Sequence, residues 1–211
     1  MRRKKKLLLI ILGGIIFTFF IYKVCYEKKY DLVSLGDSLC YGQTLYNIKG
    51  YSFNDYLKDY YEKNNLLKSY NSDYCQNELN SQDILNAIAN NSPTNDNLTI
   101  DQVLNKADII TIAVGLDEID KSNINTYLSN IDSILKLIRG FNDTKIYVLG
   151  IFGNNNKIDD INNWLSKIAL KYNATYVSIT DINNKDYLFE ENNKYVNYLG
   201  HKEIYKKILA N

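Results

Sequence analysis

The sequence predicts an α/β domain built on a five-stranded parallel sheet with helices on both faces. Short apolar runs recur along the chain without alternation of polar and apolar residues, which is typical of strands buried on both faces. Segments with apolar residues at helical spacing separate these runs. Strands and helices that alternate in this way form parallel sheets, and we expect the strand order 2-1-3-4-5.

The expected strands are short, and most of them are strongly apolar. They fall at about residues 32–35, 66–70, 109–114, 146–149 and 176–179. The second of these is the weakest, because polar residues follow it directly. The chain after its N-terminal segment has about 180 residues, which suits a single domain.

The expected helices lie between the strands and carry apolar residues on one face. They span about residues 53–60, 81–90, 101–106, 124–138, 158–172 and 199–209. Ser52 and Ser81 are the expected N-caps of the first two helices, because a serine hydroxyl accepts a hydrogen bond from the first turn. In the helix at 158–172 we expect Trp164 to face the core. Polar residues around Pro93 predict a loop.

A basic cluster followed by an apolar segment begins the chain. Residues 2–6 are all arginine or lysine, and residues 7–22 carry no charge. These 16 residues are slightly fewer than the ~20 that span a bilayer, but Val24 and Cys25 extend the apolar length. A cleaved signal peptide is the alternative, but cleavage requires small residues and no alanine precedes Ala87. We therefore expect one uncleaved transmembrane helix.

This N-terminal segment predicts both the location of the domain and its charge. Basic residues stay on the cytoplasmic side, so residues 1–29 form a tail and anchor and residues 30–211 form an extracytoplasmic domain at the cell membrane. Residues 30–211 hold 17 of the 25 basic and 23 of the 24 acidic residues, a net charge of −6. An acidic domain without a basic stripe argues against nucleic acid as a partner.

The most informative motif follows the first strand and reads Gly36-Asp37-Ser38-Leu39, with Gly42 shortly after. A serine just past a buried strand lies where open α/β sheets place their ligand sites, although these residues are also common in simple turns. The motif resembles the first block of the SGNH (GDSL) hydrolases, which are serine esterases, lipases and acyl-transfer enzymes with a flavodoxin-like three-layer fold. The resemblance implies that Ser38 is the nucleophile and that its backbone N–H belongs to the oxyanion hole.

The other signature blocks of this family are altered in the chain. Asp117 stands where the third block has an asparagine that donates a hydrogen bond to the oxyanion, and a carboxylate only accepts hydrogen bonds. In the last block, Asn192 stands at the aspartate position and Tyr195 at the histidine position. The second-block glycine falls at Glu78. Only Ser38 matches among the four signature positions.

The acid and base candidates around Ser38 are few. The single histidine, His201, lies six residues past the histidine position, and we expect its ring to pack or cap the last helix; its use as the catalytic base is the alternative. We expect Asp37 and Asp117 to lie near Ser38, and Glu118 to be a solvated loop acid. The chain has no metal-ligand spacing and no glycine-rich phosphate loop, so we expect no metal and no cofactor.

Three cysteines outside the cytoplasm allow one disulfide. In the fold that the resemblance implies, the loops that carry Cys40 and Cys75 are neighbours, so we expect a bond between these two. Cys25 would lie at the membrane edge.

Two classes of function agree with these observations. The expected one is a membrane-anchored SGNH-like protein of the cell envelope that is catalytically impaired, because a serine hydroxyl is a weak nucleophile without an adjacent base. The alternative is an active esterase, lipase or O-acyl transferase that uses Ser38 with a non-standard base. The expected ligands are an acyl ester, a lipid or a cell-wall glycan.

Overall fold

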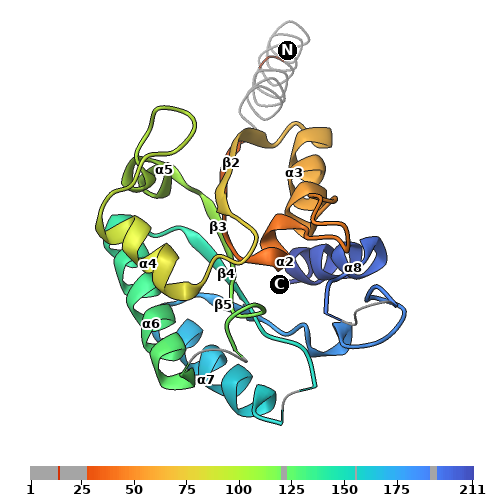
Figure 1. The fold of residues 1–211 in the computed structure, drawn as a ribbon. Helices are drawn as coiled ribbons and strands as arrows, with labels where there is room; N and C mark the ends of the chain where they lie inside the picture. Colours follow the sequence, from red (N-terminus) through yellow and green to blue (C-terminus); the bar gives the residue numbers. More distant parts are fainter. Residues whose placement is uncertain (1–13, 15–27, 120–122, 155, 191–193) are drawn as a thin grey trace, which may run out of the picture.

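The computed structural model describes residue 14 and residues 28–119, 123–154, 156–190 and 194–211 (Figure 1). The strands are β1 (Tyr30–Gly36), β2 (Leu67–Cys75), β3 (Ile109–Ala113), β4 (Lys145–Leu149) and β5 (Thr175–Val177). The helices are α2 (Ser38–Tyr41), α3 (Phe53–Lys63), α4 (Ser81–Ala89), α5 (Ile100–Lys106), α6 (Ile124–Phe141), α7 (Ile158–Lys171) and α8 (Tyr198–Leu209), with a 3-10 turn at Thr180–Ile182.

The five strands form one parallel sheet in the order β2-β1-β3-β4-β5, which confirms the predicted topology. Strands β1 and β3 are neighbours at the centre, with Leu35 opposite Ile112 and Gly36 opposite Ala113. Because the pair is parallel and in this register, the loops after the two strands leave the sheet at the same edge. The topology therefore brings the segment after Gly36 next to the segment after Ala113.

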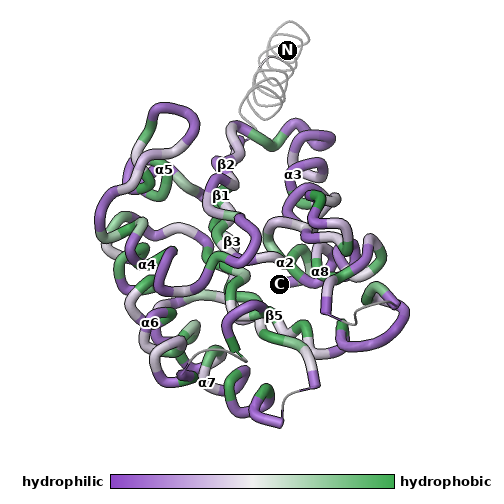
Figure 2. The backbone as a smooth tube through the Cα atoms, viewed as in Figure 1, coloured by the Kyte–Doolittle hydropathy of each residue, from purple (hydrophilic) through white to green (hydrophobic). Residues whose placement is uncertain are grey.

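Helices cover both faces of the sheet and give the fold three layers. One core lies between the sheet and helices α4, α5, α6 and α7, and the other between the sheet and helices α3 and α8. Along β1, Val33 and Leu35 point into the first core and Leu32 into the second, as expected for a strand that is buried on both faces. Figure 2 shows the hydrophobic residues gathered along the central strands, with hydrophilic residues on the outward turns.

Three details differ from the sequence-based prediction. The cap of α4 is Asn80 with a capping box to Asp83, and Ser81 lies inside the helix instead. Trp164 is 54% exposed, so its predicted place in the core is wrong. Strand β2 continues to Cys75 through polar residues, because an edge strand needs hydrogen bonds to its neighbour but no apolar side chains on both faces.

The predicted transmembrane helix lies outside the described residues, apart from Gly14. Among the helices that the structure does describe, none combines the length and the hydropathy that a bilayer span requires.

Candidate active site

Ser38 is the first residue of α2, directly after the turn that follows β1. The turn needs Gly36 because a Cβ at this position would overlap the carbonyl oxygen of Ala113 on the neighbouring strand. The φ angle of Gly36 is not positive, so the requirement for glycine at this position is space and not backbone conformation. Gly42 ends α2 in the left-handed conformation, with φ +77°. Sequence and sheet register together thus place a buried serine at the carboxyl edge of the two central strands.

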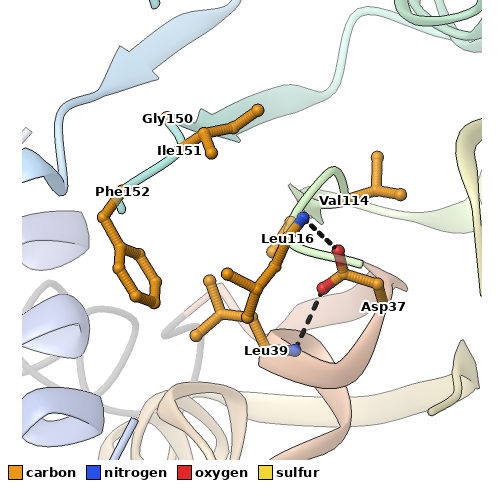
Figure 3. Close-up of a pocket in the computed structure, with 8 residues that line it drawn as sticks. Asp37, Leu39, Val114, Leu116, Gly150, Ile151 and Phe152 are labelled. Carbon is orange, nitrogen blue, oxygen red and sulfur yellow. Dashed lines mark hydrogen bonds between the residues drawn. The ribbon is translucent and has the colours of Figure 1, made fainter. Parts of the chain in front are cut away.

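Asp37 joins the loop after β1 to the loop after β3. Its carboxylate caps α2 by accepting the N–H of Leu39 at 3.0 Å and also accepts the N–H of Leu116 at 2.7 Å (Figure 3). The N–H of Gly115 donates to the same carboxylate at 2.7 Å. Burial, with a contribution from the charge of Asp117, raises the pKa of Asp37 to about 7, although these N–H donors act in the opposite direction. Asp37 therefore fixes the two loops relative to each other.

The cavity beside Asp37 is small. It has a volume of about 10 Å³ and lies between Leu39, Leu116, Ile151 and Phe152 (Figure 3). That volume is about the size of a single water molecule. This cavity therefore has no room for an acyl chain.

Ser38 and Asp117 lie in direct contact, as the strand order predicts. The backbone N–H of Ser38 donates to Asp117 Oδ2 at 3.2 Å, and the Ser38 hydroxyl contacts the same oxygen. The N–H that the SGNH resemblance assigns to the oxyanion hole is therefore occupied by a carboxylate oxygen of the protein itself.

Lys194 holds Asp117 in its charged form. Its Nζ lies 2.6 Å from Asp117 Oδ1. Burial alone would raise the pKa of Asp117, but the hydrogen bonds from Lys194 and Ser38 and the lysine charge outweigh this effect, and the pKa is lowered. Burial would likewise lower the pKa of Lys194, but Asp117 outweighs it and the pKa is raised. Both partners are therefore ionised at neutral pH.

The sequence analysis did not identify Lys194 as a site residue. The one indication in the sequence was its place next to Tyr195, which stands at the histidine position of the family. Tyr195, at the histidine position, accepts a backbone hydrogen bond from Phe189 N–H through its carbonyl. The Lys194 ammonium lies 5.2 Å from the centre of the Tyr195 ring. Asn192, at the aspartate position, lies outside the described residues. In this segment, it is Lys194 that reaches the acid beside Ser38.

The ring of His201 contacts the start of helix α3 and not Ser38. Its Nδ1 accepts the backbone N–H of Phe53 at 3.3 Å, and its ring stacks on Phe53 with centroids 6.4 Å apart. Phe53 is the first residue of α3, so the imidazole satisfies one of the N–H groups that every helix start leaves open. Burial lowers the pKa of His201 to about 3. The ring is therefore neutral at physiological pH and acts as the hydrogen-bond acceptor for an N–H group at the start of α3.

Two residues after β2 complete the surroundings of the Ser38 hydroxyl. Asn77 Oδ1 lies 2.7 Å from Ser38 Oγ, and the Glu78 N–H donates to the same oxygen at 3.3 Å. Glu78 has φ +61°, a left-handed conformation that favours glycine, and this is the position where the family resemblance places a glycine. The sequence analysis missed Asn77, because nothing in its local pattern separates it from other loop asparagines.

The predicted disulfide between Cys40 and Cys75 is present, with the two Cα atoms 5.1 Å apart. Cys40 lies in α2, two residues after Ser38, and Cys75 ends β2, two residues before Asn77. The bond therefore ties the loop that carries Asn77 and Glu78 to the helix that carries Ser38.

Glu118 is buried, so its predicted place as a solvated loop acid is wrong. Its carboxylate accepts the Ser81 N–H at 2.8 Å and the Ser81 hydroxyl at 2.7 Å. A carboxylate at a helix start is stabilised by the free N–H groups there, which explains why this acid turns inward. Over the described ranges, His, Cys, Asp and Glu side chains form no group of three that could hold a metal ion.

Comparisons with known proteins identify the fold. No protein-family model and no curated protein matches the sequence. A lipase, Lip_vut3, from a goat rumen metagenome matches with a TM-score of 0.61 and 18% identity, over 85% of this chain and 95% of its own. The psychrotrophic esterase EstA from Pseudoalteromonas sp. matches with a TM-score of 0.65 and 15% identity, over 85% and 94%.

A third match carries the family in its description. A putative lipolytic protein of the G-D-S-L family from Desulfitobacterium hafniense has a TM-score of 0.62 and 16% identity, over 84% of this chain and 96% of its own. Together with the parallel sheet in the order β2-β1-β3-β4-β5, these matches show that the chain has the fold of the SGNH (GDSL) hydrolases.

Proposed function

We propose that this protein is a membrane-anchored SGNH-fold protein of the cell envelope whose Ser38 is catalytically impaired and whose role is binding. One observation carries the proposal: the N–H and the hydroxyl of Ser38 both contact the Asp117 carboxylate. A serine esterase uses these two groups for other purposes, namely to stabilise the oxyanion and to attack the ester.

The first consequence concerns the oxyanion. In acyl transfer, negative charge develops on the carbonyl oxygen, and hydrogen-bond donors must surround it. Removal of one donor costs ~2.7–4 kcal/mol of transition-state stabilisation, or a factor of ~10²–10³ in rate. Here the Ser38 N–H already donates to Asp117. The Asp117 carboxylate, kept ionised by Lys194, would also repel the negative charge that develops on the carbonyl oxygen. The electrostatics of the site therefore oppose an ester-cleaving transition state.

The second consequence concerns the base. Among the described side chains, Asp117 is the titratable group in contact with Ser38 Oγ. An ordinary aspartate has a pKa of ~3.9 against ~6.5 for histidine, so it is the weaker base by ~3.5 kcal/mol. Lys194 lowers the pKa of Asp117 further and is itself protonated. The pair thus holds the Ser38 hydroxyl in place without removing its proton.

The proposed location of the protein is supported by its N-terminal segment and its cysteines. The basic residues 2–6 and the uncharged residues 7–22 support an anchor with the domain outside the cytoplasm. The bond between Cys40 and Cys75 supports the same side of the membrane, because disulfides persist in oxidising compartments. Candidate ligands at the envelope are an acyl ester, a lipid or a cell-wall glycan.

An activity-based label tests the proposal. The full chain in detergent is treated with a fluorophosphonate and assayed on p-nitrophenyl acetate, beside a Ser38→Ala variant and an active serine esterase as positive control. We expect no stoichiometric label and equal background hydrolysis in wild type and Ser38→Ala. Stoichiometric labelling that is lost in Ser38→Ala would overturn the proposal and establish the alternative, an active esterase or O-acyl transferase.

A further inference from the structure

A second cavity, separate from the Ser38 contacts, lies where two short hairpins meet the start of α8. It has a volume of about 150 Å³, and its walls include Tyr51, Phe189, Val196 and Tyr198, with His201 among the lining residues. The other lining residues are Gly42, Thr44 and Gly50, so aromatic and aliphatic side chains form half of the wall. The single histidine of the chain borders the cavity.

The walls of the cavity are held in place by local hydrogen bonds. The first hairpin is closed by the bridge between Gln43 and Lys49 and by the Gly50 N–H, which donates to the Gly42 carbonyl at 2.8 Å. Gln43 also donates through Nε2 to Asn47 Oδ1 at 2.9 Å. A Cβ at Gly50 would come within 2.8 Å of the Thr44 methyl group, so a side chain at this position would crowd the loop.

The second wall is a bridge between Leu188 and Val196, with the Phe189 N–H donating to the Tyr195 carbonyl at 3.0 Å. Both walls thus exist before any ligand arrives. A cavity that is already formed binds a ligand without the cost of ordering its own loops.

The His201 ring borders this cavity and has one nitrogen engaged outside it. The residue is 3% exposed, and its Nδ1 accepts the Phe53 N–H. A neutral imidazole that accepts at Nδ1 carries its proton on Nε2. Among the described residues no hydrogen-bond partner of Nε2 is present, so the Nε2–H donor is available to a ligand in the cavity that the ring borders.

Exposed apolar side chains gather around the same cavity. Tyr46 is 79% exposed, Ile48 64% and Tyr198 66%. Tyr51 is 46% exposed, and both Tyr51 and Tyr198 line the cavity. Apolar walls with a few polar groups are the usual composition of a small-molecule site, and here Thr44, His201 and the tyrosines supply the polar groups.

We propose that this cavity binds a single aromatic ring that carries a hydrogen-bond-accepting oxygen, as a phenol does. A cavity of ~150 Å³ lined by apolar side chains is known to hold a benzene ring, so the volume matches one ring. The ring would pack against Tyr51, Phe189 and Tyr198, and its oxygen would accept the Nε2–H of His201. The inference goes beyond the proposed function, because it uses neither Ser38 nor Asp117.

Phenol is the probe, and the single histidine makes the test specific. The full chain in detergent is labelled with 15N-histidine, so its imidazole signals all come from His201. We expect phenol to shift the Nε2 signal saturably, with a Kd of about 1 mM for a ligand of this size. Toluene, which has the same ring and no acceptor oxygen, should bind at least about fivefold more weakly, because the Nε2–H then stays unpaired.

Two variants on one helix turn distinguish the cavity from general apolar binding. Tyr198→Ala removes a wall and should weaken phenol binding at least about fivefold, whereas Leu199→Ala, which does not line the cavity, should change it less than about twofold. A linear, non-saturating shift would show partition into detergent and would overturn the proposal. Equal effects of the two variants, or a cavity that holds water alone and gives no shift, would also overturn it.

Discussion

The ion pair between Lys194 and Asp117 predicts a large coupling energy between two residues that are far apart in the sequence. Asp117 has a side chain that is 4% exposed, whereas that of Lys194 is 39% exposed. Loss of one partner of a fully buried pair costs ~3–5 kcal/mol, because a buried charge stays behind. Water can partly replace the half-exposed lysine, so we expect Lys194→Met to cost ~1–3 kcal/mol at pH 7.

A double-mutant cycle measures the coupling directly. Lys194→Met, Asp117→Asn and the double variant are compared with wild type by equilibrium denaturation. If Asp117 is ionised, Lys194→Met should cost much less in the Asp117→Asn background, and the coupling should be ~1–3 kcal/mol. For a domain of this size, each kcal/mol corresponds to a change in Tm of ~2–4 °C. Lys202→Met is the matched control, because Lys202 is exposed on α8 and forms no ion pair with any residue that the structure describes.

The sign of the pH dependence follows from the lowered pKa of Asp117. A carboxyl group whose folded-state pKa is lowered stabilises the fold above its unfolded pKa of ~3.9 and loses that contribution as the pH falls through the folded value. Lys194→Met removes the hydrogen bond and the charge by which Lys194 lowers this pKa, so the pH-dependent stabilisation should be smaller in the variant. A coupling near zero, or a cost of Lys202→Met as large as that of Lys194→Met, would refute an ionised Asp117 and with it the charge argument against catalysis.

Three further predictions test the remaining features of the site. Burial lowers the pKa of His201 to about 3, so its 15N imidazole signals should not titrate between pH 8 and pH 5, and a titration near pH 6.5 would contradict the burial. Below pH ~6.5 the unfolded chain binds a proton at this residue and the folded chain does not, so the free energy of unfolding should fall by up to ~1.4 kcal/mol per pH unit, and His201→Leu should remove this part of the slope. The disulfide between Cys40 and Cys75 encloses a sequence separation of 35, so reduction should lower the free energy of unfolding by ~2–4 kcal/mol, and equal stability with and without reductant would count against the bond. Glu118→Ala should lower the free energy of unfolding by ~1–3 kcal/mol, because Ser81 loses two buried charge-assisted hydrogen bonds. The control Glu190→Ala, at an exposed position, should leave the free energy of unfolding unchanged in the same denaturation assay, and an equally small effect of Glu118→Ala would show that Glu118 is solvated.

Hydrogen bonds within the turn that carries Ser38 stabilise this part of the fold. Asp37 accepts N–H groups from both loops, and Ser38 continues this network by donating to Asp117. Replacement of the turn residues would leave buried N–H groups unpaired, at ~1–3 kcal/mol each. The turn is therefore stabilising in its own right, whether or not the hydroxyl reacts.

Local patterns in the sequence were sufficient for the architecture and for the position of the serine. Apolar runs such as 109–113 read as strands because burial on both faces excludes polar residues, and the parallel order then placed Ser38 beside Asp117. The strands and the position of Ser38 depend on hydrophobic periodicity and on strand order, and both can be read from one chain. The pairing of Cys40 with Cys75 was instead expected from the fold that the SGNH resemblance implies.

Only the tertiary structure showed which charged groups form ion pairs and which residues are the hydrogen-bond partners of buried polar groups. Lys194 forms an ion pair with Asp117, which lies 77 residues earlier in the sequence, and Glu118 accepts a hydrogen bond from Ser81. His201 accepts the N–H of the first residue of α3. Trp164 has helical spacing for the core yet lies on the surface. The physical reason is that hydrophobic burial has a period that local sequence displays, whereas the partner of a buried polar group is whichever side chain the packing of distant segments brings within 3 Å.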